Sequence, residues 1–302
     1  MRARAPGKVV LSGAYAVLEG APALVSAVDR YVVADTARAP TFEAPEVRAA
    51  LPSGPLPHFD ASALRKNDRK LGLGSSAAIV VASLAAVVLE EEPDLPPAEL
   101  ANRVWQPALL AHRTAQGGGS GIDVVTSAFG ATRRCWIESD GLHSEAHMLP
   151  PGLHIDVYAA REASSTPKML ATVRAWSARN FCEYRRTMDA LSEAAKATST
   201  ASDLDTYLES IAEQLTQLAH MGDESGAPIV PTSLRELARE ARRDRVAVHP
   251  SGAGGGDIVL CMGLFEACER WEGRLERAGL ERLEVRVNAL GVHRAPDGAD
   301  PA

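Results

Sequence analysis

Two serines follow a pair of glycines in the segment Lys70–Ala78, KLGLGSSAA, which directly precedes the apolar run IVVASLAAVVL. The first turn of a helix leaves about four backbone N–H groups unpaired and carries roughly half a positive charge. Glycine lets the backbone approach a ligand closely, and a serine hydroxyl can cap the helix or reach a metal ion. This combination favours a phosphate site at a helix N-terminus, although a serine-capped helix after a tight turn fits the same residues.

Charged residues stand beside two further glycine segments. Lys8 follows Pro6 and Gly7 at the start of an apolar run, and Asp123 closes the segment AQGGGSGID. A lysine can stabilise developing negative charge, and a carboxylate can accept a hydrogen bond or a proton. A surface lysine at a strand start and a turn aspartate are the structural alternatives. A third glycine segment, HPSGAGGGD, spans residues 249–257.

The elements that must position these residues follow from apolar periodicity. Residues 8–18, 23–37, 133–139 and 153–160 have the short apolar runs of strands. Residues 75–92 predict a helix that is apolar on nearly every side and therefore buried, and residues 96–116 predict a second helix. Residues 40–62 carry five prolines and predict a loop with little regular structure.

The composition of the chain changes near residue 150. Residues 167–222 have helical spacing, with a break at 198–203. Residues 246–263 predict strand, glycine loop and strand, and residues 282–290 alternate like a half-exposed strand. We therefore expect two domains, residues 1–150 and residues 151–302.

The overall charge limits the classes of ligand. The 302 residues carry a net charge of -7, which disfavours nonspecific binding to nucleic acid or to an anionic membrane. An anionic substrate would need locally clustered cations. The chain has no apolar run of about 18 residues, and its four cysteines show no C-x-x-C spacing. We expect a cytoplasmic protein without a zinc site or a disulfide framework.

The ordered set APGKVVLSGAYAVLEG, GLGSSAA, AQGGGSGIDVVTSAFG and HPSGAGGGDIVL resembles the GHMP small-molecule kinases. The segments KLGLGSSAA, AHRTAQGGGSGID, SSTPKML and PSGAGGGD are most similar to the phosphomevalonate kinase branch. The resemblance implies an α+β fold: a ribosomal-protein-S5-domain-2-like, ATP-binding N-terminal domain over residues 1–150, and a ferredoxin-like C-terminal domain over residues 151–302.

The resemblance also implies roles for individual residues. The catalytic residues would be Lys8 and Asp123. ATP phosphates would bind at Gly72, Leu73, Gly74, Ser75, Ser76 and Ala77, with Ser76 as a ligand of Mg²⁺. The substrate would contact Lys8, Tyr15, Lys70, Arg113, Gly119, Ser120, Lys168, Ser251, Gly252, Ala253 and Gly254.

Three positions depart from the family pattern. Ala14 stands where the first motif usually has an acidic residue, and His249 stands where the third motif usually has lysine. His112 replaces a glutamate that binds the metal in mevalonate kinases, and imidazole is a poor ligand for Mg²⁺. We expect His112 to be a hydrogen-bonded helix residue, and Trp105 to be a packed helix residue rather than an adenine contact.

The resemblance implies ATP- and Mg²⁺-dependent phosphorylation of phosphomevalonate to diphosphomevalonate, in a mevalonate route to isoprenoids. Such an enzyme would be a monomer or homodimer without nucleic-acid or membrane partners. Mevalonate kinase or another small-molecule kinase of the family is one alternative. A non-catalytic, ligand-binding regulator on the same fold is another; Ala14 and His249 favour it, whereas the presence of both Lys8 and Asp123 opposes it.

Overall fold

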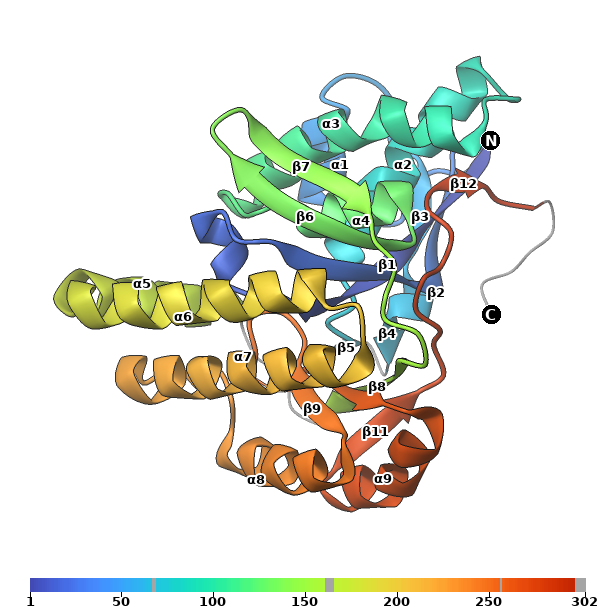
Figure 1. Cartoon of the computed structure of the whole chain (residues 1–302). Helices are drawn as coiled ribbons and strands as arrows, with labels where there is room; N and C mark the ends of the chain where they lie inside the picture. Colours follow the sequence, from blue (N-terminus) through green and yellow to red (C-terminus); the bar gives the residue numbers. More distant parts are fainter. Residues whose placement is uncertain (67–68, 161–165, 256, 297–302) are drawn as a thin grey trace. The chain divides into compact units, whose positions relative to one another are not determined.

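The computed structural model describes residues 1–66, 69–160, 166–255 and 257–296, with the side chains of residues 166–168 outside the description. Along the chain (Figure 1) the elements are β1 (Arg2–Ser12), η1 (Ala16–Glu19), β2 (Ala23–Asp35), α1 (Pro45–Ala50), β3 (His58–Asp60), η2 (Ser62–Leu64), β4 (Arg65–Lys66), β5 (Arg69–Lys70), α2 (Ser75–Glu91), α3 (Pro97–Gln116), α4 (Ile122–Phe129) and β6 (Thr132–Glu138). They continue with β7 (Gly141–Ala146), β8 (His154–Ala160), α5 (Thr166–Arg179), α6 (Phe181–Thr200), α7 (Leu204–Ser225), α8 (Thr232–Ala241), η3 (Arg242–Asp244), β9 (Ala247–Pro250), β10 (Ile258–Gly263), α9 (Phe265–Arg277), β11 (Leu280–Leu283) and β12 (His293–Arg294).

The chain forms two compact units that are discontinuous in sequence. The first unit contains Met1–Val9, Val25–Arg133 and the segment from Arg286 onward, and the second contains Val10–Leu24 and Arg134–Val285. The sequence predicted one boundary near residue 150. The observed division differs because β1, β2 and β6 each pass from one unit to the other.

In the first unit the central element is α2, which packs against α1, α3 and α4. Most of its alanine and valine side chains are buried, as the all-round apolar sequence predicted. The larger sheet of the chain has the strand order β12-β1-β2-β6-β7, with β3 paired to β2. Within the unit, β12 joins β1 through the antiparallel pair Ala3↔Arg294.

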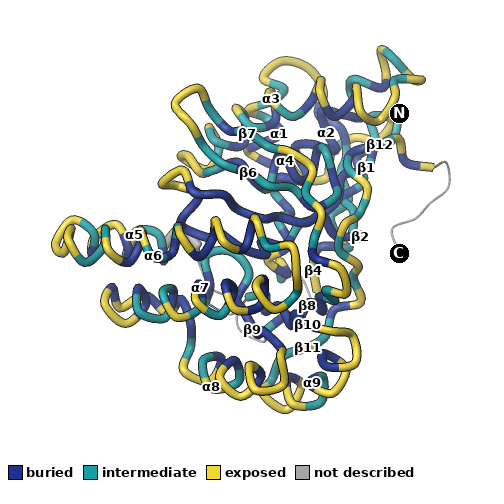
Figure 2. The backbone as a smooth tube through the Cα atoms, viewed as in Figure 1, coloured by how far each residue is buried: buried dark blue, intermediate teal, exposed yellow. Residues whose placement is uncertain are grey.

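The second unit contains an antiparallel sheet of four strands in the order β11-β8-β10-β9. Its register is set by pairs such as Val259↔Tyr158 and Leu260↔His249. The helices α6 and α7 pack along one another (Figure 1). The helices α8 and α9 are amphipathic, with exposed outer faces and buried inner faces (Figure 2).

Several predicted elements need correction. Residues 40–62 are not a plain loop, because α1 and β3 form there; Pro45 is compatible with the first helical position, and Val47 is buried. The N-terminal strand stops at Ser12, where Gly13 adopts a positive φ of 80°. Of residues 282–290 only the first two extend a strand, and the hairpin of β4 and β5 was not predicted. Among the described helices, none has the length and apolarity needed to span a membrane.

Candidate functional site

Lys8 and the first glycine loop lie together in the first unit. The backbone N–H of Lys8 donates to the Leu73 carbonyl oxygen at 2.8 Å. Gly74 is the N-cap of α2 in the left-handed conformation, with φ 76° and ψ 35°. A Cβ atom at Gly74 would lie 2.9 Å from both Cγ and Cε of Lys8. The lysine stem therefore crosses directly over Gly74, and glycine is required there for space as well as for φ.

The N-terminus of α2 fits an anionic ligand. No side chain among the described residues caps it by a hydrogen bond. The carbonyl of Gly74 accepts from Ala78 N at 3.2 Å, which begins the helical ladder and leaves the earlier N–H groups at the open end. Those N–H groups and the helix dipole favour a negative charge at this end, with Ser75 and Ser76 in the first turn.

His112 lies between the first turn of α2 and the first turn of α4. Ser76 Oγ lies 3.0 Å from His112 Nε2, and the same nitrogen lies 3.9 Å from Asp123 Oδ2. His112 is buried, which confirms its prediction as a hydrogen-bonded helix residue. The Oδ1 atom of Asp123 accepts from Val124 N at 3.0 Å. The stem of Lys8 thus lies over Gly74 at the start of α2. Asp123 lies near the same helix end, beside the His112 ring that contacts Ser76.

The second glycine loop is held by Arg113. Its Nε donates to the Gly119 carbonyl at 3.1 Å, and its Nη2 donates to the Ser120 carbonyl at 3.0 Å. The loop ends at Gly121, the N-cap of α4, directly before the turn that carries Asp123. Arg113 therefore positions this loop, and a substrate contact would have to use its remaining N–H groups.

The third glycine loop is held by the N-terminal turn within the second unit. The hydroxyl of Tyr15 donates to the Ala253 carbonyl at 2.7 Å, and Ser251 Oγ accepts from Val10 N at 2.8 Å. Burial raises the pKa of Tyr15 well above its usual value, so the phenol is a neutral donor. Tyr15 has a positive φ of 63°, which the surrounding contacts must maintain.

Gln214 was not predicted as part of this arrangement. Its buried amide accepts from Gly13 N at 2.8 Å and donates to Ser12 Oγ at 2.9 Å and to Thr198 Oγ1 at 2.6 Å. It thereby fixes the turn that precedes Tyr15. The available signal was its place on the apolar face of α7, where the buried neighbours are Tyr207, Ile211, Leu218 and Met221.

The remaining predicted residues lie elsewhere or outside the description. Lys70 is exposed on β5, and Gly252 is half-buried in the third loop. Lys168 belongs to α5, but its side chain is not described; Ser164, Ser165 and Gly256 are also outside the described residues. Trp105 is half-buried, with its ring 6.2 Å from that of Phe129, as expected for a packed helix residue.

His249 lies in the interior on β9. Its Nδ1–H donates to the Pro250 carbonyl at 2.7 Å, and its Nε2 has no partner among the described residues. Burial lowers the pKa of His249 from 6.5 to about 4. Neutral imidazole is the form compatible with this site, because an unpaired charge there would be costly.

We expect the stability of the protein to fall in mild acid because of His249. Its pKa is lower in the folded state, so below about pH 6.5 the unfolded state binds the proton more readily. The free energy of unfolding should therefore decrease by about 3 kcal/mol as the pH falls from 6.5 to 4. Urea titrations at several pH values should show a weaker pH dependence for His249→Leu than for the parent. An equal pH dependence of the free energy of unfolding in both proteins would show that His249 does not cause the loss of stability in acid.

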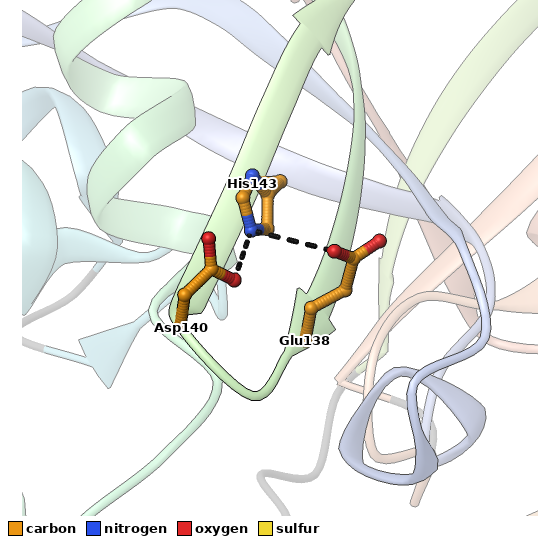
Figure 3. A group of neighbouring side chains, drawn as sticks. All are labelled: Glu138, Asp140 and His143. Carbon is orange, nitrogen blue, oxygen red and sulfur yellow. Dashed lines mark hydrogen bonds and ion pairs between the residues drawn. The ribbon is translucent and has the colours of Figure 1, made fainter.

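A separate group of metal-type donors occurs on the hairpin of β6 and β7 in the second unit (Figure 3). Glu138, Asp140 and His143 each have one donor atom within 4.8 Å of the others. His143 Nε2 lies 2.7 Å from Asp140 Oδ1. This hydrogen bond lowers the pKa of Asp140 and raises that of His143. Both carboxylates are exposed and His143 is half-buried, and the imidazole is already the hydrogen-bond partner of Asp140.

The chain was compared with known families, proteins and structures. Residues 48–131 match the family described as GHMP kinases N terminal domain. Phosphomevalonate kinase of Streptomyces sp. (strain CL190) is 28% identical over 243 residues, which cover 70% of this chain and 64% of that protein. Mevalonate kinase of Archaeoglobus fulgidus is 27% identical over 288 residues, covering 88% of this chain and 93% of that protein.

Solved structures extend the likeness over nearly the whole chain. The Lin0012 protein from Listeria innocua has a TM-score of 0.83 at 21% identity, covering 97% of this chain and 99% of its own. Phosphomevalonate kinase from Streptococcus pneumoniae, in complex with phosphomevalonate and AMPPNP, has a TM-score of 0.70 at 17% identity. The match covers 95% of this chain and 99% of that one.

Proposed function

We propose that this chain, whose residues 48–131 match the GHMP kinase N-terminal domain, transfers a phosphoryl group from ATP to phosphomevalonate, forming diphosphomevalonate in a mevalonate pathway. The observation that carries the proposal is the uncapped N-terminus of α2, where Lys8 crosses Gly74 and Asp123 is linked to Ser76 through His112. Two relatives named phosphomevalonate kinase support this choice of substrate.

The donor nucleotide would bind at the first glycine loop. The N–H groups that open α2 suit the phosphates, which Gly72, Leu73, Gly74, Ser75, Ser76 and Ala77 would surround. When bound, Mg²⁺ would neutralise charge on these phosphates. Ser76 suits a Mg²⁺ ligand if its hydroxyl donates to His112 Nε2, because its lone pairs then remain available. Water and phosphate oxygens would complete the coordination, since His112 is not an oxygen ligand.

The acceptor would be positioned by Lys8 and Asp123. A phosphate acceptor is already anionic, so deprotonation by a general base is less important than for a hydroxyl acceptor. The ammonium of Lys8 would offset charge on the acceptor and on the transferred group. Asp123, at the start of α4, would orient the acceptor and set the local field. The reaction would take place in the cytoplasm, in a monomer or homodimer.

Mevalonate kinase is the second candidate, because the Archaeoglobus relative of that name aligns over 93% of its own length. That enzyme type phosphorylates a hydroxyl, for which Asp123 would have to act more directly as a base. The replacement of the metal-binding glutamate by His112 is an argument against it. A regulator without turnover would retain nucleotide binding and release no ADP.

We expect kcat/KM for phosphomevalonate to exceed that for mevalonate by at least about 100-fold, because a site built for a charged group penalises its absence. A coupled ADP-release assay should compare mevalonate, phosphomevalonate, homoserine and galactose at equal enzyme concentration. A higher kcat/KM for mevalonate would replace the proposal with mevalonate kinase. No ADP release with any acceptor, together with calorimetric binding of ATP, would assign the regulator instead.

A further inference from the structure

A cavity of about 130 Å³ lies within the second unit, between α7, the end of α8 and the start of β9. Both helices pack against β9. Its apolar wall includes a stripe of α7 together with residues of α8 and β9: Leu208, Ile211, Ala212, Leu215, Ala238 and Val248. None of the lining residues belongs to the three glycine loops.

The size of this cavity limits what it can hold. Sites for drug-sized molecules usually measure about 300–1,000 Å³, whereas an aliphatic cavity of about 150 Å³ can hold one benzene molecule. The space therefore suits a single small apolar group, such as a branched aliphatic chain. Ala212 and Leu215 are only half-buried, so the apolar wall reaches the surface and a ligand can enter with a polar end left outside.

Four exposed, charged side chains also line the cavity. Asp205 of α7 forms an ion pair with Arg245, which precedes β9. Glu209 follows one turn later on α7, and Arg242 lies three residues before Arg245. Within the described part of the chain, no hydrogen bond or ion pair involves the side chain of Glu209 or of Arg242. One couple of opposite charges is thus closed, and a second couple is open.

We propose that this cavity binds a zwitterionic amino acid with a branched aliphatic side chain of the size of leucine. Its side chain would occupy the apolar space, its carboxylate would pair with Arg242, and its ammonium group would pair with Glu209. The lining carries two positive and two negative side chains, which fits a ligand without net charge. A simple anion or cation would satisfy only one member of the open couple. The assignment does not depend on the proposed kinase activity.

Calorimetry should compare L-leucine with two ligands that each lack one of its features. 4-Methylpentanoate lacks the ammonium group and glycine lacks the side chain, so each should bind at least about tenfold more weakly than leucine. Arg242→Gln and Glu209→Gln should each weaken leucine binding by about tenfold or more. Glu209→Gln should also lose the preference for leucine over 4-methylpentanoate. Ala212→Leu, which fills the apolar space, should abolish binding.

The controls are Glu213→Gln, one turn after Glu209 on α7, and Arg243→Gln, beside Arg242; neither residue lines the cavity. Both variants should bind leucine as the parent does. No saturable binding of leucine up to about 10 mM, equal affinity of the parent for leucine and 4-methylpentanoate, or an equal loss in the controls would overturn the proposal. Leucine binding that persists in folded Ala212→Leu would exclude this cavity as the site. Because binding is the readout, a failure of the kinase assay would leave these outcomes unaffected.

Discussion

Replacing Asp123 with asparagine is expected to lower kcat by about 10²- to 10⁴-fold with little change in Tm. Asparagine retains an Oδ1 atom that can accept from Val124 N, so the first turn of α4 should remain intact. It removes the negative charge 3.9 Å from His112 Nε2 and with it the group proposed to orient the acceptor. Lys8→Met should also lower kcat strongly, since it removes the charge proposed to stabilise the transferred group.

Steady-state kinetics with phosphomevalonate and thermal unfolding of the same preparations would test these effects. Asp60→Asn is a matched control in the first unit, because the Oδ1 of Asp60 also accepts a local backbone N–H, that of Ser62, at 2.8 Å. Its kcat should remain within about twofold of the parent. Near-normal turnover in Asp123→Asn would show that Asp123 has only a structural role in its turn. Near-normal turnover in Lys8→Met would show that the charge of Lys8 does not stabilise the transferred group.

Replacing Gly74 with valine is expected to weaken ATP binding by about 100-fold or more. A branched side chain would occupy the space where phosphate must approach the backbone, at a cost of at least two charge-assisted hydrogen bonds of about 1.5–3 kcal/mol each. Its Cβ would also displace the stem of Lys8, which lies 2.9 Å away. Calorimetric titration with ATP in the presence of Mg²⁺ would measure the loss.

Backbone strain must be separated from the loss of the phosphate site. Gly226 provides the control, because its φ of 75° nearly equals the 76° of Gly74 and a Cβ there meets nothing within 4 Å. Gly226→Val should show a comparable loss of stability from the left-handed conformation but unchanged ATP affinity. Unchanged ATP binding in folded Gly74→Val would exclude the first glycine loop as the phosphate site.

The milder change Gly74→Ala can show how much the contact between Gly74 and Lys8 contributes to kcat. Alanine should act mainly by moving the flexible lysine side chain, because the contacting atoms are Cγ and Cε of Lys8. Its effect on kcat should therefore be smaller in a Lys8→Met background than in the parent. A double-mutant cycle would give this coupling, and full additivity would show that Gly74 and Lys8 act independently.

The sequence by itself predicted the resemblance to GHMP kinases, the mixed α/β class of the fold and the start of α2. The GHMP kinase fold that the glycine segments implied is confirmed by the comparisons. The segment GLGSSAA combines glycines, serines and a long apolar run within a few residues, and these are local signals. Local signals also predicted the burial of α2 and the break between α6 and α7. Local patterns are sufficient to locate a candidate site that is formed by a helix terminus.

Only the tertiary structure decided which side chains support the site. Ser76 and His112 are 36 residues apart, and Gln214 lies 201 residues from the Gly13 amide that it accepts from. Arg113 was predicted as a substrate contact, yet its guanidinium holds the loop that precedes Asp123. Such contacts depend on how distant segments pack, and periodicity carries no information about that.

The register of β4 and β5 and the division into units were decided in the same way. A run of basic residues alone does not show that Arg65 faces Lys70 and that Lys66 faces Arg69, because opposition depends on strand pairing. A shift of composition near residue 150 does not show that β1, β2 and β6 each contribute to both units. The sequence specified the local chemistry, whereas long-range pairing and packing selected the partners through which it can act.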